Sequence, residues 1–343
     1  LLPDFSSLLT SAVDLRIDGS ASVDVFGFVV GTASFSIVQG ASTVDTGNGN
    51  IGTGGSLADA SVMIISLSNL NLFAGMGAAI NDNGTPANTN DDVIDTNNAV
   101  GFSIAGGSVE MALVRPANLT AGDKTSYLGL ELSLAGASLT GIDGLTFIAS
   151  GSILVNKATD AAGLAGTERV DWATATDTAG LLPDFSDELT RTVELFVDGS
   201  AALDLFGFVV GKADFSLTSQ TVDVDQNANG FFSTTEKDLD DATLLTIGLS
   251  NLTVFAGVGA ALDDNGDPED VSGYTIDTTV ADGLPADAIG FSVSGGSLAL
   301  AILKANPEKI AGDNRTYIGM TSQLGIAEFV GLPDGLTIKA KDI

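Results

Sequence analysis

The chain has 343 residues, enough for two or three ordinary domains with a substantial core. Its formal net charge of −31 at pH 7 argues against nucleic acid and anionic membrane surfaces as partners, while a hydrophobic content of 44% excludes a disordered chain. The absence of Cys and His excludes disulfide, thiol and imidazole chemistry. No apolar run reaches the roughly eighteen residues of a membrane helix, so we expect no membrane insertion.

Residue usage predicts strands and turns. Gly is abundant at 42 of 343 residues, Ser, Thr, Asn and Val are frequent, and Glu and Lys are scarce, so we expect an all-β fold with little helix. The chain opens on Leu1-Leu2-Pro3 without Met or a signal sequence, which we interpret as an internal or processed segment. The lack of Cys is compatible with secretion, and we expect an extracellular or cell-surface location.

The sequence contains one unit twice. Leu1–Ser6 recurs 180 residues later as Leu181–Ser186, and Asp143–Thr146 recurs 191 residues later as Asp334–Thr337. The offset between the copies grows only in Gly-, Asn- and Asp-rich stretches. Insertions accumulate in exposed loops, so these stretches indicate loops, and the stretches of constant offset indicate strands.

This repeat predicts two tandem homologous β-rich units. The first covers 1–180, of which 156–180 is a weakly ordered connector, and the second covers 181–343. The second unit is cut short by about 28 residues, because Ile343 aligns with Ser152 of the first. We expect either further units in the chain or a neighbouring copy to complete it, as in a quasi-one-dimensional array.

In chain order, the residue pattern of the first unit predicts a short helical or irregular lead-in at 4–10, followed by strands. The expected strands cover 12–17, about 23–37, 61–67, 70–80, 100–104, 108–114, 127–134, 138–140 and 145–155. Asp18-Gly19 breaks the first strand, and polar loops are expected at 39–57 and 81–98. Long strands with glycine kinks favour a sandwich-like or solenoid-like arrangement.

The repeated Phe-Gly-Phe motif, Phe26–Phe28 and Phe206–Phe208, is predicted to lie within a long strand. Alternate residues on one side of this strand are apolar or glycine, and the other side is aromatic at mid-length, so both faces need a cover. The candidate interface residues are Phe26, Phe28, Phe206 and Phe208. They either close the core between two layers of one unit, the interpretation we favour, or contact a neighbouring unit or polymer.

The segment Asp225–Glu236 fits the spacing of a calcium-binding loop, D-x-[DN]-x-[DN]-G-x5-E. Alternate oxygens fold round one hard cation, glycine permits the turn, and the glutamate closes the site. The predicted ligands are Asp225, Asn227, Asn229, the Phe231 carbonyl and Glu236, and calcium is the expected cofactor. The alternative is a polar hairpin loop that fits by chance, and the matching loop at 45–52 lacks the closing acid.

Two further acidic loops predict either calcium sites or solvated turns. Their carboxylates are Asp82, Asp91, Asp92 and Asp95 in the first unit and Asp263, Asp264 and Asp267 in the second. Bound cations would also relieve the self-repulsion of so negative a chain.

No enzymatic constellation emerges, and we expect no enzyme. Asp45-Thr46-Gly47 spells an aspartic-protease tripeptide, but the second unit lacks a partner for it. Glycosidases often flank their carboxylates with aromatic platforms, and this chain has one Trp and three Tyr.

The strand and glycine pattern resembles the repeat of giant bacterial surface proteins of the LEPR-XLL type. The residues that carry the resemblance are Asp24–Phe28, Phe73–Gly77, Gly101–Ser103, Ser126–Leu130, Asp143–Thr146 and Asp171-Trp172. The resemblance implies a very long, secreted or cell-attached repeat protein without enzymatic chemistry, although the loops of this chain are longer.

We therefore expect a structural repeat segment of an extracellular fibre, surface layer or giant adhesin stalk, assembling end to end with further copies of the same repeat. The alternative is an adhesin module that binds a ligand or glycan through its variable acidic loops. Clustered aromatic residues in those loops would favour the alternative, and only Tyr274 and the Phe231-Phe232 pair qualify.

Overall fold

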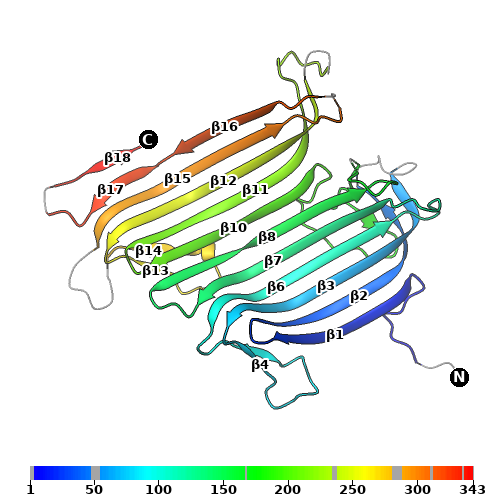
Figure 1. Cartoon of the computed structure of the whole chain (residues 1–343), viewed down its shortest axis with the longest axis horizontal. Helices are drawn as coiled ribbons and strands as arrows, with labels where there is room; N and C mark the ends of the chain where they lie inside the picture. The colour runs from blue at the N-terminus through cyan, green and yellow to red at the C-terminus, as the bar shows by residue number, and fades with distance from the viewer. Residues whose placement is uncertain are drawn as a thin grey trace.

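The chain folds into one very large antiparallel sheet, which confirms the all-β class (Figure 1). The computed structural model describes residues 4–47, 55–166, 168–233, 238–279, 288–309, 312–333 and 336–342. Strands account for 61% of the structure, and the described residues contain no α-helix. The only helical element in these ranges is one 3-10 turn, η2 (Val271–Gly273).

The strands of the first unit are β1 (Val13–Val25), β2 (Val29–Asp45), β3 (Ser56–Met76), β4 (Ala79–Asn81), β5 (Val93–Asp95), β6 (Val100–Arg115), β7 (Ser126–Thr140), β8 (Leu145–Thr159) and β9 (Thr176–Asp177). Those of the second unit are β10 (Val193–Leu205), β11 (Val209–Val224), β12 (Leu239–Val258), β13 (Ala261–Asp263), β14 (Thr275–Asp277), β15 (Ile289–Lys304), β16 (Thr316–Gln323), β17 (Ile326–Val330) and β18 (Lys339–Lys341).

The main sheet is a meander in which neighbours in sequence are neighbours in space. Its order is β1-β2-β3-β6-β7-β8-β10-β11-β12-β15-β17-β18, with β16 also on β15 and β9 on β2. The hairpins β4–β5 and β13–β14 form two small separate sheets. Because β8 pairs with β10, the sheet passes from the first unit to the second without interruption.

The two faces of the sheet differ in chemistry, as the period-two alternation of the strands dictates. One face, here the open face, carries mainly aliphatic and aromatic side chains, and many are partly exposed, including Val23 at 51% and Phe291 at 44%. The opposite face, the covered face, has a central band of Ser, Thr, Asp and Glu. Hydrogen bonds such as Ser66 Oγ to Glu110 Oε2 (2.5 Å) and Ser200 Oγ to Asp214 Oδ1 (2.6 Å) cross between its strands.

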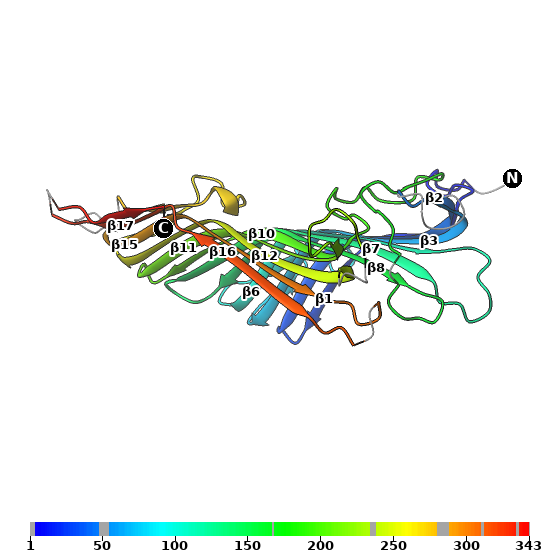
Figure 2. The same cartoon turned by 90° about the horizontal axis from the view of Figure 1, so that it is seen from above.

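Three segments pack on the covered face, on either side of the polar band. The connector between the units covers the largest core cluster, which includes Val62, Leu154 and Trp172. The β4–β5 hairpin covers Val30 and Phe73, and the β13–β14 segment covers the corresponding residues of the second unit. Figure 2 shows the sheet nearly edge-on as one thin layer, with the connector and the β13–β14 segment rising from it.

Several predictions about the elements are wrong. The described residues form one large open sheet with two small hairpin sheets, rather than a sandwich of two facing sheets or a solenoid of stacked coils. β1 runs through Asp18-Gly19 without a break, and β3, β6 and β7 each join two predicted strands into one. Bulges, not strand ends, accommodate the glycine and asparagine positions in these long strands; Asn69 in β3 has φ = 50°.

The largest error concerns the Phe-Gly-Phe motif, which forms a tight turn instead of strand. Phe26 and Gly27 both have positive φ (54° and 68°), and the Phe28 N–H donates to the Val25 carbonyl (3.0 Å). The Phe206 turn repeats this geometry. The motif is predicted as strand because the apolar alternation of the strands on either side continues through it. In the structure, the Asp24 carboxylate accepts the Gly27 N–H (2.7 Å) and stabilises the turn.

Candidate functional site: the junction between the units

The first part of the junction is the pairing of β8 with β10. Residues 145–155 pair with 195–205 in unbroken register, and Gly151 lies opposite Gly199. A Cβ at Gly199 would lie 2.1 Å from the Ser150 carbonyl oxygen, so no other residue fits there without displacing the strands. Ser152 donates a hydrogen bond to Asp198 across the same pair.

The second part is the connector, which was predicted to be weakly ordered and is instead packed. Trp172 is 2% exposed and lies on Gly129 of β7, where an added Cβ would meet the indole ring at 2.8 Å. The indole Nε1 donates to the Asn156 side-chain oxygen (3.1 Å). Asn156 is fully buried, and its amide donates to the carbonyls of Val170 (2.8 Å) and Thr190 (2.9 Å). It thereby fastens the connector to β8 and to the lead-in of the second unit.

The third part is that lead-in, 181–192. Phe185 packs edge-on against Trp172, with ring centroids 5.4 Å apart, and Leu189 is fully buried in the same cluster. Arg169 is 8% exposed, forms an ion pair with Glu194 of β10 and donates to the Arg191 carbonyl (3.3 Å). The lead-in therefore joins the core of the first unit to the first strand of the second.

Asp177 closes the end of the connector. Its carboxylate accepts hydrogen bonds from the backbone N–H groups of Ala179 (3.1 Å), Leu181 (3.0 Å) and Leu182 (3.1 Å). Burial raises the pKa of Asp177, but these N–H groups and the Ser42 hydroxyl outweigh it and hold the pKa below its ordinary value of 3.8. The ionised form of Asp177 thus stabilises the folded junction.

The turn at Phe206 also belongs to the junction. The Phe206 N–H donates to the Gly144 carbonyl (2.6 Å), and a Cβ at Gly144 would lie 2.4 Å from the Phe206 ring. The ring therefore rests on the turn between β7 and β8. A phenylalanine with positive φ is uncommon, because its Cβ crowds the following carbonyl, so the turn is strained at this residue.

The chain presents the same surface a second time, at the free edge of β1. Phe5 and Leu9, the counterparts of Phe185 and Leu189, are 64% and 47% exposed, and Phe26 is 93% exposed against 63% for Phe206. At Gly19, the counterpart of Gly199, the nearest neighbour of an added Cβ is the Phe35 ring (3.0 Å). The predicted interface residues Phe26 and Phe206 thus lie in turns at the sheet end, with Phe28 and Phe208 beside them, 59% and 60% exposed.

The predicted calcium loop is only partly described, since Glu236 lies outside the described residues. In the described part, the candidate oxygens accept backbone N–H groups: Asp225 from Ala228 (2.8 Å) and Gly230 (2.8 Å), and Asn229 Oδ1 from Phe231 (2.7 Å). Asn227 Oδ1 likewise accepts the Asn229 N–H (2.9 Å). The loop is thus held by a series of short Asx turns.

Sequence reasoning missed Asp238, which organises this same loop. Asp238 is fully buried, and its carboxylate accepts the N–H groups of Gln226 (2.9 Å) and Ser233 (2.8 Å). In the sequence, Asp238 stands directly before an apolar strand, and this position does not indicate that its carboxylate binds the loop backbone.

The other two acidic loops lie in and beside the β4–β5 and β13–β14 hairpins, at corresponding places in the two units. In the first, Asp82 accepts the Gly84 N–H (3.0 Å) and Asp91 accepts the Thr85 hydroxyl (2.8 Å). Asp92 and Asp95 follow in the same segment, and Asp95 accepts the Asn97 N–H (2.9 Å).

The loop of the second unit follows the same design. Asp263, Asp264 and Asp267 accept the N–H groups of Asn265 (2.8 Å), Gly266 (2.9 Å) and Glu269 (3.2 Å). These carboxylates therefore shape turns, and each keeps oxygen lone pairs for other partners.

Within the described ranges, three carboxylates converge at one place, where Asp223, Asp240 and Asp241 bring one oxygen each within 4.8 Å of one another. Lys309 lies against this group, with Nζ 2.5 Å from Asp241 and 3.9 Å from Asp240. The hydrogen bond to Asp241 raises the pKa of Lys309. The ammonium group of Lys309 already offsets part of the negative charge of these carboxylates, so a metal ion would reduce less repulsion there.

The key junction residues Asn156, Arg169 and Trp172 were not selected as functional from the sequence. The single Trp of the chain, in a region that otherwise reads as polar, is the signal that could have located the packed connector.

The chain matches no known protein-family model, no curated protein and no solved structure. In the part of the chain that the structure describes, no helix is long and apolar enough to span a membrane. The fold defines a class of protein: an all-β chain dominated by one large antiparallel sheet, in which β8 pairs with β10.

Proposed function

We propose that the chain is a structural repeat segment of an extracellular fibre, surface layer or adhesin stalk, in which units add edge to edge into a growing sheet. The observation that carries this proposal is the pairing of β8 with β10 over 145–155 and 195–205, which joins two homologous units as if they were one. A joint of this kind can repeat along an array wherever one unit presents an edge like that of β8 and the next presents an edge like that of β10.

The free edge of β1 supports the proposal. Folded proteins usually protect an edge strand with charge, proline or a covering segment. β1 is 13 residues long, contains no proline, and is flanked by the exposed Phe5, Leu9 and Phe26. Burying one such side chain contributes about 1.5–3 kcal/mol, so covering all three would contribute several kcal/mol to a joint between copies.

Electron microscopy of the purified chain at increasing concentration tests this function. We expect ribbons that lengthen with concentration, and monodisperse particles of 34.5 kDa at every concentration would overturn the proposal. The Gly19→Ala variant is the matched control. The nearest neighbour of its methyl group within the chain is the Phe35 ring at 3.0 Å, but at the equivalent Gly199 it would meet the backbone of the paired strand at 2.1 Å. This variant should fold and fail to form ribbons.

The chain's charge supports calcium as the partner that stabilises the acidic loops. A net charge of −31 destabilises a compact chain, and divalent cations at 225–236, 82–95 and 263–267 would reduce the repulsion. Thermal unfolding with calcium and with a chelator tests this. A ligand that binds only the folded state raises the unfolding midpoint, so identical midpoints would refute calcium binding.

One observation favours a second candidate, a ligand- or glycan-binding adhesin module. Phe231 and Phe232, beside the 225–236 loop, are 76% and 46% exposed, and exposed aromatic rings beside polar groups suit sugar binding. A glycan array separates the two functions: reproducible binding that the double variant Phe231→Ala/Phe232→Ala abolishes would favour the module.

A further inference from the structure

The covered face of the second unit contains a hollow at the place where the first unit holds its tryptophan. In the first unit, Ile64, Ala112 and Gly129 form one cross-strand row beneath the connector. Ile64 is 5% exposed and Ala112 is fully buried, and the Trp172 ring lies on Gly129. Glycine at this place lets the indole lie directly on the backbone of β7.

The corresponding row of the second unit is Thr246, Ala301 and Gly319. The register is the same, since Thr246 pairs with Ala301 and Ala301 pairs with Gly319. An added Cβ at Gly319 would have nothing within 4 Å. Tyr317, the counterpart of the 8% exposed Tyr127, is 41% exposed. This part of the second unit therefore has the floor of the tryptophan site without its cover.

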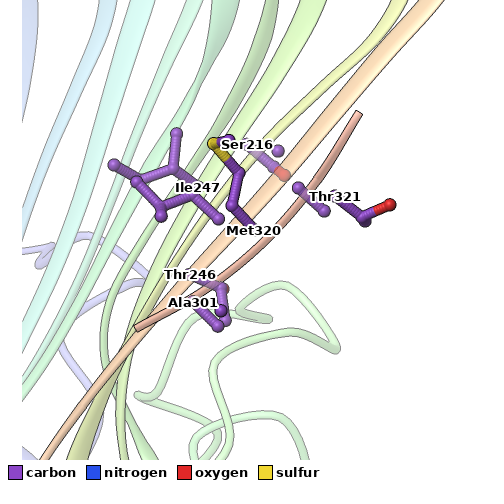
Figure 3. Close-up of a pocket in the computed structure, with 10 residues that line it drawn as sticks. Ser216, Thr246, Ile247, Ala301, Met320 and Thr321 are labelled. Atoms are coloured by element: carbon purple, nitrogen blue, oxygen red, sulfur yellow. The ribbon is translucent and has the colours of Figure 1, made fainter. Parts of the chain in front are cut away.

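A hollow of about 430 Å³ lies over this row. Figure 3 shows Thr246 and Ala301 side by side at its base, with Met320 and Ile247 on the other side of the strands. Ser216, Gly248, Ala299 and Thr321 form the adjacent cross-strand row of its lining. The lining residues are small or apolar and none is charged, which suits an aromatic ring rather than an ion.

We propose that this hollow is a binding site for an indole ring, presented by a segment of the same kind as the connector 160–180 with its Asp171-Trp172 pair. Trp172 on Gly129 is the template, because it shows which ring the row accepts and in which place. The proposal rests on the proposed function, since a repeated connector implies repeated units. It specifies the occupant of the second unit's covered face, whereas the proposed function concerns the edge of β1.

The site predicts that a connector supplied in the correct register will dock. The test is an extended chain in which the sequence 153–180 is appended after Ile343, following the alignment of Ile343 with Ser152. Linking the segment makes docking intramolecular and so avoids the weak affinity of a free peptide. The chain has one Trp, so labelling with 5-fluorotryptophan gives one fluorine resonance for the parent and two for the extended chain.

We expect the second resonance to lie near that of buried Trp172 and to move to the position of free tryptophan in the Gly319→Val variant of the extended chain. In the parent chain, Gly319→Val should leave the unfolding midpoint unchanged, because the space is open. The proposal would be overturned by a second resonance at the position of free tryptophan in the extended chain, or by one that does not shift in the Gly319→Val variant. If the parent chain forms ribbons, the proposed function stands whether or not the indole docks. If the indole docks and the parent chain forms no ribbons, the proposed function is overturned and the indole site stands.

Discussion

The edges of β10 and β1 have similar sequences but differ in how far their flanking residues are buried. Phe185 and Leu189 before β10 are 8% and 0% exposed, whereas Phe5 and Leu9 before β1 are 64% and 47% exposed. The difference lies in the neighbour: β10 has β8 and the connector beside it, and β1 has no strand on its outer side among the described residues. The comparison teaches that the same lead-in residues are buried only where a neighbouring strand and the connector cover them.

The energetic consequence is that contacts across the junction contribute to stability. The largest core cluster among the described residues lies mainly in the first unit, and Phe185 and Leu189 of the second unit complete it. In a linear array, stability is approximately a sum of unit terms and nearest-neighbour terms. Matched substitutions at positions where the two edges carry the same residue separate these terms, because the neighbouring segments differ.

The largest effect is expected for leucine at the two edges. Leu189→Ala should lower the free energy of unfolding by about 2–5 kcal/mol, because it leaves a cavity in the junction, whereas Leu9→Ala should change it by less than about 0.5 kcal/mol. Urea unfolding of both variants provides the measurement. Equal losses would show that Leu9 is buried in solution and that the two edges do not differ.

The next effect concerns the two glycines under the tryptophan row. Gly129→Ala places a methyl group 2.8 Å from the Trp172 ring, and overpacking of this kind costs about 1–3 kcal/mol. Gly319→Ala meets nothing within 4 Å and should be neutral or stabilise the chain by a few tenths of a kcal/mol. Thermal unfolding monitored by Trp172 fluorescence compares them. A similar loss at Gly319 would indicate that the hollow is closed.

A smaller effect follows from Asp177. Because its pKa is lowered in the folded state, its contribution to stability is present above the unfolded-state pKa, near 3.8, and is lost as the pH falls through the lower folded-state value. The urea concentration at the unfolding midpoint of the parent chain should therefore decrease when the pH is lowered below about 4. Asp177→Asn should lower the midpoint at pH 7 and flatten this decline. An unaltered pH profile in the variant would exclude Asp177 as a contributor.

The smallest effect distinguishes the two Phe-Gly turns. Phe26→Asn should stabilise the chain by up to about 1–2 kcal/mol, because asparagine tolerates positive φ better and the Phe26 ring is 93% exposed. Phe206→Asn relieves the same strain but loses the contact with the Gly144 turn, so it should be close to neutral. Differential scanning calorimetry measures both. A loss of stability in Phe26→Asn would show that the Phe26 ring is already packed.

The sequence predicted the all-β class, which the structure confirms, and the approximate strand positions. It failed at the Phe-Gly-Phe motif, since an aromatic residue with positive φ contradicts local preference and only the paired strands β1 and β2 impose the turn. It also failed at Asn156, whose buried position in β8 depends on the connector that crosses it.

The candidate metal residues show the same division. The spacing of Asp225, Asn227 and Asn229 predicted a loop of alternating oxygens, and a tight loop is present, with those oxygens bound to backbone N–H groups. Asp238 completes the loop from the start of β12, and its burial depends on the pairing of β11 with β12. Local spacing determines turns, but the choice of buried carboxylates depends on contacts between segments.

The sequence alone determined what each strand can bury: an apolar side, a polar side, and glycines where backbones approach. These properties follow from side-chain chemistry and the two-residue period of a strand. Only the tertiary structure decided which copy of each residue is buried. Phe5 and Phe185 share one local sequence, and the presence of β8 and the connector beside one of them separates an exposed ring from a core residue.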